Sequence, residues 1–108
     1  MKLANLHQAS SWFEILQTTE KCQTAVMTLP AGKASGDTAE AHEHSEQVLL
    51  VVHGELEAEV GGEIFQMGEG DMVIVPAGTK HRFVNRGEWP AVTFNVYTPP
   101  EYAPGEQG

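Results

Sequence analysis

The sequence predicts an all-β protein, an antiparallel sandwich or barrel of about eight short strands. Short apolar or alternating segments recur along the chain, and glycine or proline separates most of them. No stretch places its apolar residues at sustained helical spacing. Short strands with turn residues between them are typical of an antiparallel fold.

The first half of the chain contains three predicted strands. Residues 12–16 are short and rich in aromatic side chains, and residues 24–29 are rich in β-branched ones until Pro30 stops them. Residues 31–40 are small and polar, which predicts a loop. Residues 48–52 form a continuous apolar run, as expected of a strand that is buried on both faces.

The second half begins with a predicted hairpin. Residues 55–60 alternate strictly between polar and apolar, so one face should be dry and the other wet. Gly61 and Gly62 follow, and glycine accepts the positive φ of a tight hairpin turn before residues 63–67 return. The remaining predicted strands are residues 72–75, 82–85 and 91–97.

Length and charge limit the classes of protein to consider. The 108 residues predict one domain over residues 1–108, with a poorly ordered tail from about residue 99. The formal charge of -9 argues against partners that are nucleic acids or anionic membranes. No apolar run approaches the ~20 residues that span a bilayer, and the N-terminus lacks a secretory signal, so we expect a cytoplasmic protein. Cys22 is the single cysteine, so no intrachain disulfide can form.

Three histidines occur at two places that a β-fold could bring together. His42 and His44 are two residues apart, and such residues share a face of a strand. Two exposed histidines could have the same spacing, so this pair alone does not identify a site. His81 follows a Pro-x-Gly turn after two further residues, at the start of a further strand. Neutral imidazoles that converge from separate strands predict a metal site.

Two stretches of the sequence, residues 36–54 and residues 70–85, resemble the two motifs of the cupin family. The resemblance extends over about residues 24–97 and implies an antiparallel double-stranded β-helix, the jelly-roll cupin barrel. In that family two histidines, a glutamate and a third histidine typically hold one divalent transition metal. The resemblance therefore implies that His42, His44 and His81 are metal ligands. The residues that carry it are Gly36, His42, His44 and Gly54 in the first motif and Gly70, Pro76, Gly78, His81 and Asn85 in the second.

The glutamate position of the first motif differs from the family pattern. Counting back from Gly54 places Gln47 there, with fewer residues after His44 than the family usually has. In a regular strand Gln47 would face away from His44, whereas Glu46 would share its face. A β-bulge could restore either candidate, and we prefer Gln47 because Gly54 fixes the register of the strand.

The predicted metal shell is thus His42, His44, Gln47 and His81. Such a shell is neutral, so the metal keeps its full charge. Relative to a shell with a carboxylate, the affinity of this shell for the metal should fall and the Lewis acidity of the bound metal should rise. Zinc, iron, nickel, manganese and copper all remain open.

These observations predict a metal-binding small cupin that acts on a small oxygen-rich metabolite, as an oxygenase or isomerase. One alternative is a non-catalytic module that binds a sugar or an organic acid. A second is a metal-free structural or interaction protein. Fold alone does not choose among the three, and no catalytic residue is assigned. The resemblance also implies a homodimer, with which the apolar run of residues 48–52 is compatible.

Overall fold

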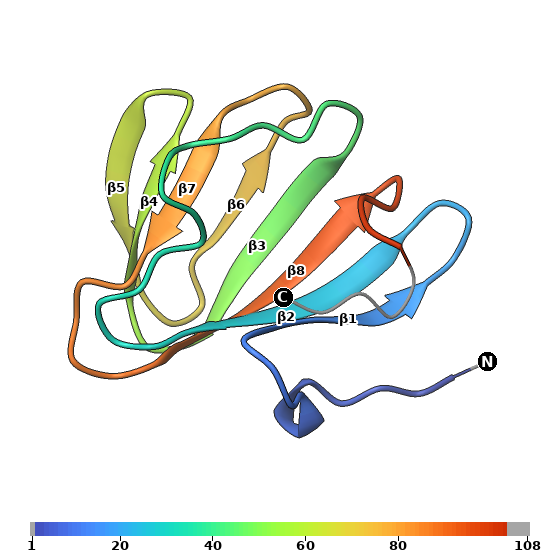
Figure 1. The fold of residues 1–108 in the computed structure, drawn as a ribbon, viewed down its shortest axis with the longest axis horizontal. Helices are drawn as coiled ribbons and strands as arrows, with labels where there is room; N and C mark the ends of the chain where they lie inside the picture. The colour runs from blue at the N-terminus through green and yellow to red at the C-terminus, as the bar shows by residue number, and fades with distance from the viewer. Residues whose placement is uncertain (1, 104–108) are drawn as a thin grey trace.

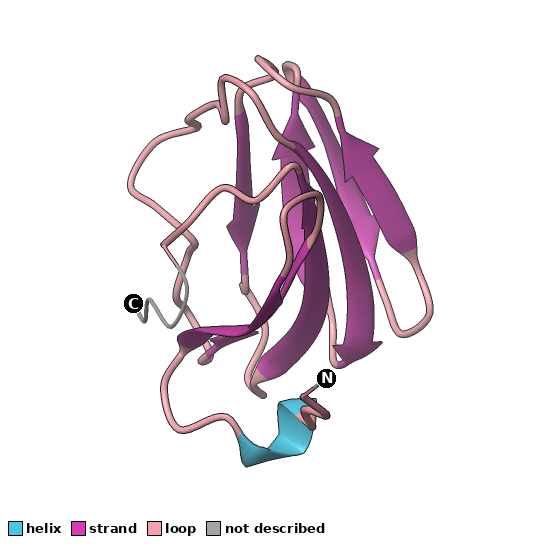
Figure 2. Ribbon diagram, turned by 90° about the vertical axis from the view of Figure 1, so that its right-hand side faces the viewer, coloured by secondary structure: helices cyan, strands magenta, loops and turns pink. Residues whose placement is uncertain are grey.

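The computed structural model describes residues 2–103, which form eight antiparallel strands in two sheets. The larger sheet has the order β1-β2-β8-β3-β6 and the smaller one β5-β4-β7 (Figure 1). The all-β prediction is therefore confirmed, and a single 3-10 turn, η1 (Leu6–Gln8), lies outside the sheets (Figure 2). The strands are β1 (Phe13–Thr18), β2 (Gln23–Leu29), β3 (Glu46–His53), β4 (Leu56–Val60), β5 (Glu63–Met67), β6 (Met72–Val75), β7 (His81–Val84) and β8 (Ala91–Thr98).

The core lies between the two sheets, because each strand turns alternate side chains toward the other sheet. Leu49 and Val51 of β3 are fully buried, as are Ala58 of β4 and Phe83 of β7. All four belong to one continuous hydrophobic cluster. At about 25 cal/mol per Å² of apolar area removed from water, this burial is the main stabilising contribution to the barrel.

The expectation that residues 48–52 are buried on both faces is wrong. Leu49 and Val51 are buried, but Val48, Leu50 and Val52 are only half-buried. The physical reason is that one face of β3 packs on the smaller sheet, whereas the other face forms the outer surface of the chain. On the neighbouring β6, Met72 and Ile74 are 66% and 61% exposed.

Glycine has two structural functions here: it forms a tight turn, and it allows two backbone segments to approach closely. Gly61 and Gly62 join β4 to β5 with φ values of 57° and 86°, the two positive φ values of a tight type I′ hairpin turn. Gly54 has a φ of 85°, and a Cβ there would lie 2.7 Å from the carbonyl oxygen of Pro90. The predicted hairpin turn is therefore present, and Gly54 allows two backbone segments to approach closely.

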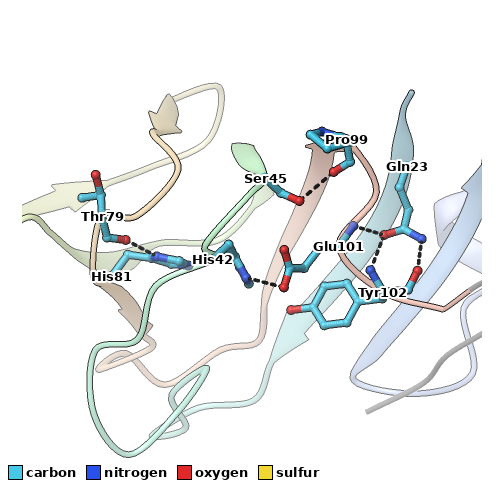
Figure 3. A network of polar contacts seen from close by, with 8 residues as sticks. All are labelled: Gln23, His42, Ser45, Thr79, His81, Pro99, Glu101 and Tyr102. Atoms are coloured by element: carbon cyan, nitrogen blue, oxygen red, sulfur yellow. Dashed lines mark hydrogen bonds and ion pairs between the residues drawn. The ribbon is translucent and has the colours of Figure 1, made fainter. Parts of the chain in front are cut away.

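The segment after β8 turns back beside β2, so that Glu101 and Tyr102 lie next to Gln23 (Figure 3). Gln23 holds it: the side-chain oxygen accepts from the backbone N–H groups of Glu101 and Tyr102, at 3.1 and 3.0 Å, and its amide donates to the carbonyl of Tyr102 at 2.8 Å. The Ser45 hydroxyl donates to the carbonyl of Pro99 at 2.7 Å. Gln23 is fully buried, so these bonds form where water does not compete.

The poorly ordered tail from about residue 99 stays a prediction. Within its first residues, backbone groups of Pro99, Glu101 and Tyr102 form hydrogen bonds with the buried side chains of Ser45 and Gln23. The rest of the predicted tail, residues 104–108, lies outside the described residues. Among residues 2–103, no helix is long and apolar enough to cross a membrane.

Candidate metal and ligand site

A cavity of about 440 Å³ opens at the end of the barrel that the C-terminal segment covers. Its walls come from the inner faces of both sheets, from the loop before β3 and from the C-terminal segment. The lining residues are Trp12, Phe13, Met27, Ser35, Gly36, Thr38, Glu40, Ala41, His42, Gln47, His81, Phe83, Tyr97, Glu101 and Tyr102.

Backbone hydrogen bonds bring His42 and His81 together although they lie far apart in the sequence. Glu40 and His81 exchange a pair of backbone bonds at 3.1 and 2.9 Å, and Gly78 N–H donates to the carbonyl of His42 at 2.7 Å. The loop is thereby fixed against the start of β7. The centroids of the two imidazole rings are 4.8 Å apart.

Each of the two imidazoles has one nitrogen held by an oxygen (Figure 3). His81 Nδ1 lies 3.0 Å from the carbonyl oxygen of Thr79, which can only accept, so Nδ1 carries the proton. His42 Nδ1 lies 3.3 Å from a carboxylate oxygen of Glu101, which favours the same tautomer. In the neutral rings Nε2 then has the lone pair that can bind a metal or a proton.

Burial of His81 lowers its pKa below the ordinary value of 6.5. The hydrogen bond to Thr79 and the nearby Glu101 carboxylate raise this pKa, and His42 lowers it, but burial has the largest effect. His81 is therefore neutral at neutral pH, the form that ligation requires.

Gln47 contributes a third group that could bind a metal, its side-chain amide oxygen. Its side chain is buried, and the amide nitrogen donates to Asn95 Oδ1 at 2.9 Å. The amide oxygen is also buried, and no hydrogen-bond partner exists for it among the described residues. A buried oxygen without a partner costs about 1–3 kcal/mol, and beside a cavity a bound ligand, ion or water could satisfy it.

The other two candidates from the sequence lie elsewhere. His44 is exposed and does not line the cavity, and Glu46 is exposed at the first position of β3. Because residues 41–45 are not part of a strand, alternation counted from His42 does not continue into β3. This break is how His42 and Gln47, an odd number of residues apart, can line the same cavity.

Sequence reasoning missed the contributions of the last strand and the segment that follows it. Tyr97 and Tyr102 line the cavity with their ring centroids 5.2 Å apart, and the His42 ring lies 5.4 Å from that of Tyr97. Burial raises the pKa of Tyr97 far above its ordinary value, so this phenol keeps its proton. Glu101 and Tyr102 follow two prolines, and no local pattern marks them as part of a site.

The donor chemistry fits a transition metal with three protein ligands. No group of three or more His, Cys, Asp or Glu side chains among residues 2–103 is arranged to hold a metal ion. Two imidazoles and one amide, from His42, His81 and Gln47, line this cavity together with the carboxylates of Glu40 and Glu101. Imidazole and oxygen ligands suit several divalent first-row metals.

The two antiparallel sheets and the cavity that they share with His42 and His81 define the class of small jelly-roll β-barrel proteins. The chain belongs to the cupin domain family, whose model matches residues 25–97. A search of curated proteins found no match.

Solved structures agree with this family assignment. BH2720 from Bacillus halodurans is similar with a TM-score of 0.87 and 24% identity, over 94% of this chain and 80% of that one. TT1209 from Thermus thermophilus gives 0.81 and 24%, over 92% and 98% of the two chains. KdgF from a Halomonas species gives 0.82 and 21%, over 93% and 94%. At these identities the likeness shows the fold alone.

Proposed function

We propose that this cupin binds a small oxygen-rich metabolite at one divalent transition metal held by His42, His81 and Gln47. The observation that carries the proposal is that three donor groups line one cavity, and a second protein group orients each of them. His44, the fourth predicted ligand, is exposed here, so the proposal does not depend on it.

The supporting contacts are those of metal-ligating side chains in general. A histidine that binds a metal usually donates its other ring nitrogen to a carbonyl or a carboxylate, which fixes the ring and its tautomer. The contacts of His81 with Thr79 and of His42 with Glu101 are of these two kinds. When bound, the metal would supply Lewis acidity for polarising an oxygen of the ligand.

The cavity favours a small, partly polar ligand. Its volume of about 440 Å³ lies in the range of small-molecule sites. Aromatic rings of Phe13, Tyr97 and Tyr102 offer apolar surface, and no lysine or arginine is among the lining residues that the structure describes. A negative charge on the ligand would therefore have to be balanced by the metal.

A sugar-like metabolite is a candidate ligand that a barrel of this fold can be proposed to hold. A protein described as a sugar phosphate isomerase from Silicibacter pomeroyi is 24% identical with a TM-score of 0.70, over 82% of this chain and 60% of that one. An isomerase or oxygenase reaction is the catalytic form of the proposal. The alternative is a binding module that holds a sugar or an organic acid without chemistry.

Metal analysis tests the proposal. We predict about one zinc, iron, nickel, manganese or copper ion per chain after supplementation, because one set of three donors lines the cavity. Loss of a group that only orients a metal ligand lowers the metal affinity by about 10–100-fold. His81→Ala and Gln47→Ala each remove a proposed ligand, so each should lower the Zn²⁺ affinity by at least that much. Isothermal titration calorimetry with Zn²⁺ measures this loss.

Two matched variants sharpen the result. Glu46→Ala removes the exposed neighbour of Gln47 and should leave the Zn²⁺ affinity unchanged. His44→Ala should cost far less than His81→Ala, and an equal loss would show that His44 joins the shell. A wild-type protein that stays metal-free after supplementation would overturn the proposal.

We also propose that two copies pair through the outer face of the larger sheet. Val48 and Leu50 of β3 lie beside Ile74 and Met72 of β6 in the register of that sheet. Met72 and Ile74 are 66% and 61% exposed, which leaves this apolar surface in water unless a second copy covers it.

A further inference from the structure

Gln47 is the first member of a chain of buried side-chain hydrogen bonds that crosses the larger sheet. Its amide nitrogen donates to Asn95 Oδ1 at 2.9 Å, and Asn95 Nδ2 donates to Thr93 Oγ1 at 3.0 Å. The Thr93 hydroxyl donates to the backbone carbonyl of Met27 at 2.9 Å. All three side chains are buried, Asn95 and Thr93 completely. We call these residues the polar relay.

The carbonyl at the end of the polar relay sets the direction of every bond in it. The oxygen of Met27 can only accept, so the Thr93 hydroxyl must donate to it. The Thr93 oxygen then accepts, and the only donor that Asn95 offers is its NH₂ group. The oxygen of Asn95 therefore faces Gln47.

The same logic fixes the amide of Gln47. Since Asn95 presents an acceptor, Gln47 must present its NH₂ group to it, and its oxygen becomes the group without a partner. Reversing the Gln47 amide would place two oxygens against each other. Relieving that repulsion would require Asn95 to reverse as well and Thr93 to give up its bond to Met27.

We infer that Thr93 and Asn95 are positioning residues that make Gln47 a fixed oxygen donor to the cavity. This inference rests on the proposed function only for the identity of what binds the Gln47 oxygen. The inference explains how an amide can occupy the position of the carboxylate that is typical of the family. The polar relay fixes which atom of the Gln47 amide, the oxygen or the nitrogen, faces the cavity. The preferred partner of that oxygen is a metal cation or an N–H or O–H donor, and an anionic oxygen is disfavoured.

A first experiment needs no metal. In metal-free protein, ¹⁵N-edited NMR with hydrogen–deuterium exchange should show slowly exchanging side-chain protons on Gln47. Asn95→Leu removes the acceptor at nearly constant volume and should make these protons exchange fast. Asn95→Asp keeps an acceptor and should preserve slow exchange. Fast exchange in the wild-type protein would overturn the inference even if the protein binds metal.

A second experiment measures function. Zn²⁺ affinity should fall by about 10–100-fold in Asn95→Leu and in Thr93→Val, as is typical when the group that orients a ligand is removed. Thr93→Ser, which keeps the hydroxyl, should stay near wild type. Asn85→Leu is the matched control, because Asn85 is equally buried but bonds to the carbonyls of Leu29 and Trp89 outside the cavity.

The outcomes separate the two proposals. If wild type binds no Zn²⁺ but Gln47 exchanges slowly, the metal site is refuted and the polar relay stands. If Asn95→Leu and Thr93→Val bind Zn²⁺ as tightly as wild type, the positioning role is refuted. Should Asn95→Leu fail to fold, Thr93→Val and Thr93→Ser give the same comparison.

Discussion

The charge state of His81 links the cavity to pH. Burial lowers the pKa of His81 below 6.5, the value that an exposed imidazole has in the unfolded chain. Below pH 6.5 the unfolded chain therefore takes up a proton that folded His81 resists. The contribution of His81 to the free energy of unfolding must fall as the pH drops from 6.5 toward the folded pKa, and it is constant above pH 7.

This linkage gives a prediction for the metal-free protein. Between pH 7 and pH 5, wild type should lose more stability than His81→Gln, because only wild type carries the group with the lowered pKa. Urea unfolding at the two pH values measures the difference, and subtracting the variant removes the effects of the other titrating groups. Equal losses in the two proteins would show that His81 is not desolvated.

The residues of the site were predictable only where the sequence has a local pattern. His42 and His81 stand in motifs, and the structure places both on one cavity. Glu101 has no such pattern, because its role depends on where a distant segment folds. Asn95 was equally hidden, since its partner Gln47 lies 48 residues away.

At the scale of elements, the strands were predictable but the orientation of β8 was not. Glycine and proline mark most strand ends, so seven of the eight observed strands begin within one residue of a predicted one. In β8, Val92, Phe94 and Val96 alternate with Thr93 and Asn95, and apolar side chains normally face the core. The structure has the reverse, with Thr93 and Asn95 fully buried. The hydrogen bonds of these two side chains, which connect three strands, override the hydrophobic pattern here.

The C-terminal segment is the element whose attachment is easiest to test. Gln23→Ala removes the three hydrogen bonds that hold the backbone of Glu101 and Tyr102, and a typical hydrogen bond contributes about 0.5–1.5 kcal/mol. We expect the free energy of unfolding to fall by about 2–3 kcal/mol in urea titrations. The amides of Glu101 and Tyr102 should also exchange faster.

Gln66→Ala is the control for this variant. Gln66 lies in β5 and is exposed, so its truncation should change stability by less than about 0.5 kcal/mol. If Gln23→Ala were as stable as Gln66→Ala, the hydrogen bonds of Gln23 would not be what holds the segment.

At the scale of the whole molecule, the proposed homodimer would form through the outer face of the larger sheet. We define the outer β3 patch as the apolar side chains that meet there in register. Because the formal charge of the chain is -9, two copies repel each other, and burial of this apolar patch would have to outweigh that repulsion. The residues are Val48 and Leu50 of β3, Met72 and Ile74 of β6, and Phe94 and Val96 of β8.

We therefore predict a homodimer that a charge in the outer β3 patch dissociates. Ile74→Glu should convert the dimer to a monomer, because pairing would bury two unpartnered carboxylates. Light scattering coupled to size-exclusion chromatography at micromolar concentration measures the mass. Ile64→Glu is the control, since Ile64 is 64% exposed but belongs to β5 of the other sheet. A monomeric wild type would contradict the prediction.

The bonds that shape the cavity join segments that are remote in the sequence. Ser45 and Pro99 are 54 residues apart, and Gln23 and Tyr102 are 79 apart. Such contacts form late and slowly in folding, because distant segments must meet before any of them is gained. Binding in the cavity and folding are therefore thermodynamically linked. A ligand that binds only the folded chain stabilises the whole barrel, by an amount that grows with the logarithm of its concentration above the dissociation constant.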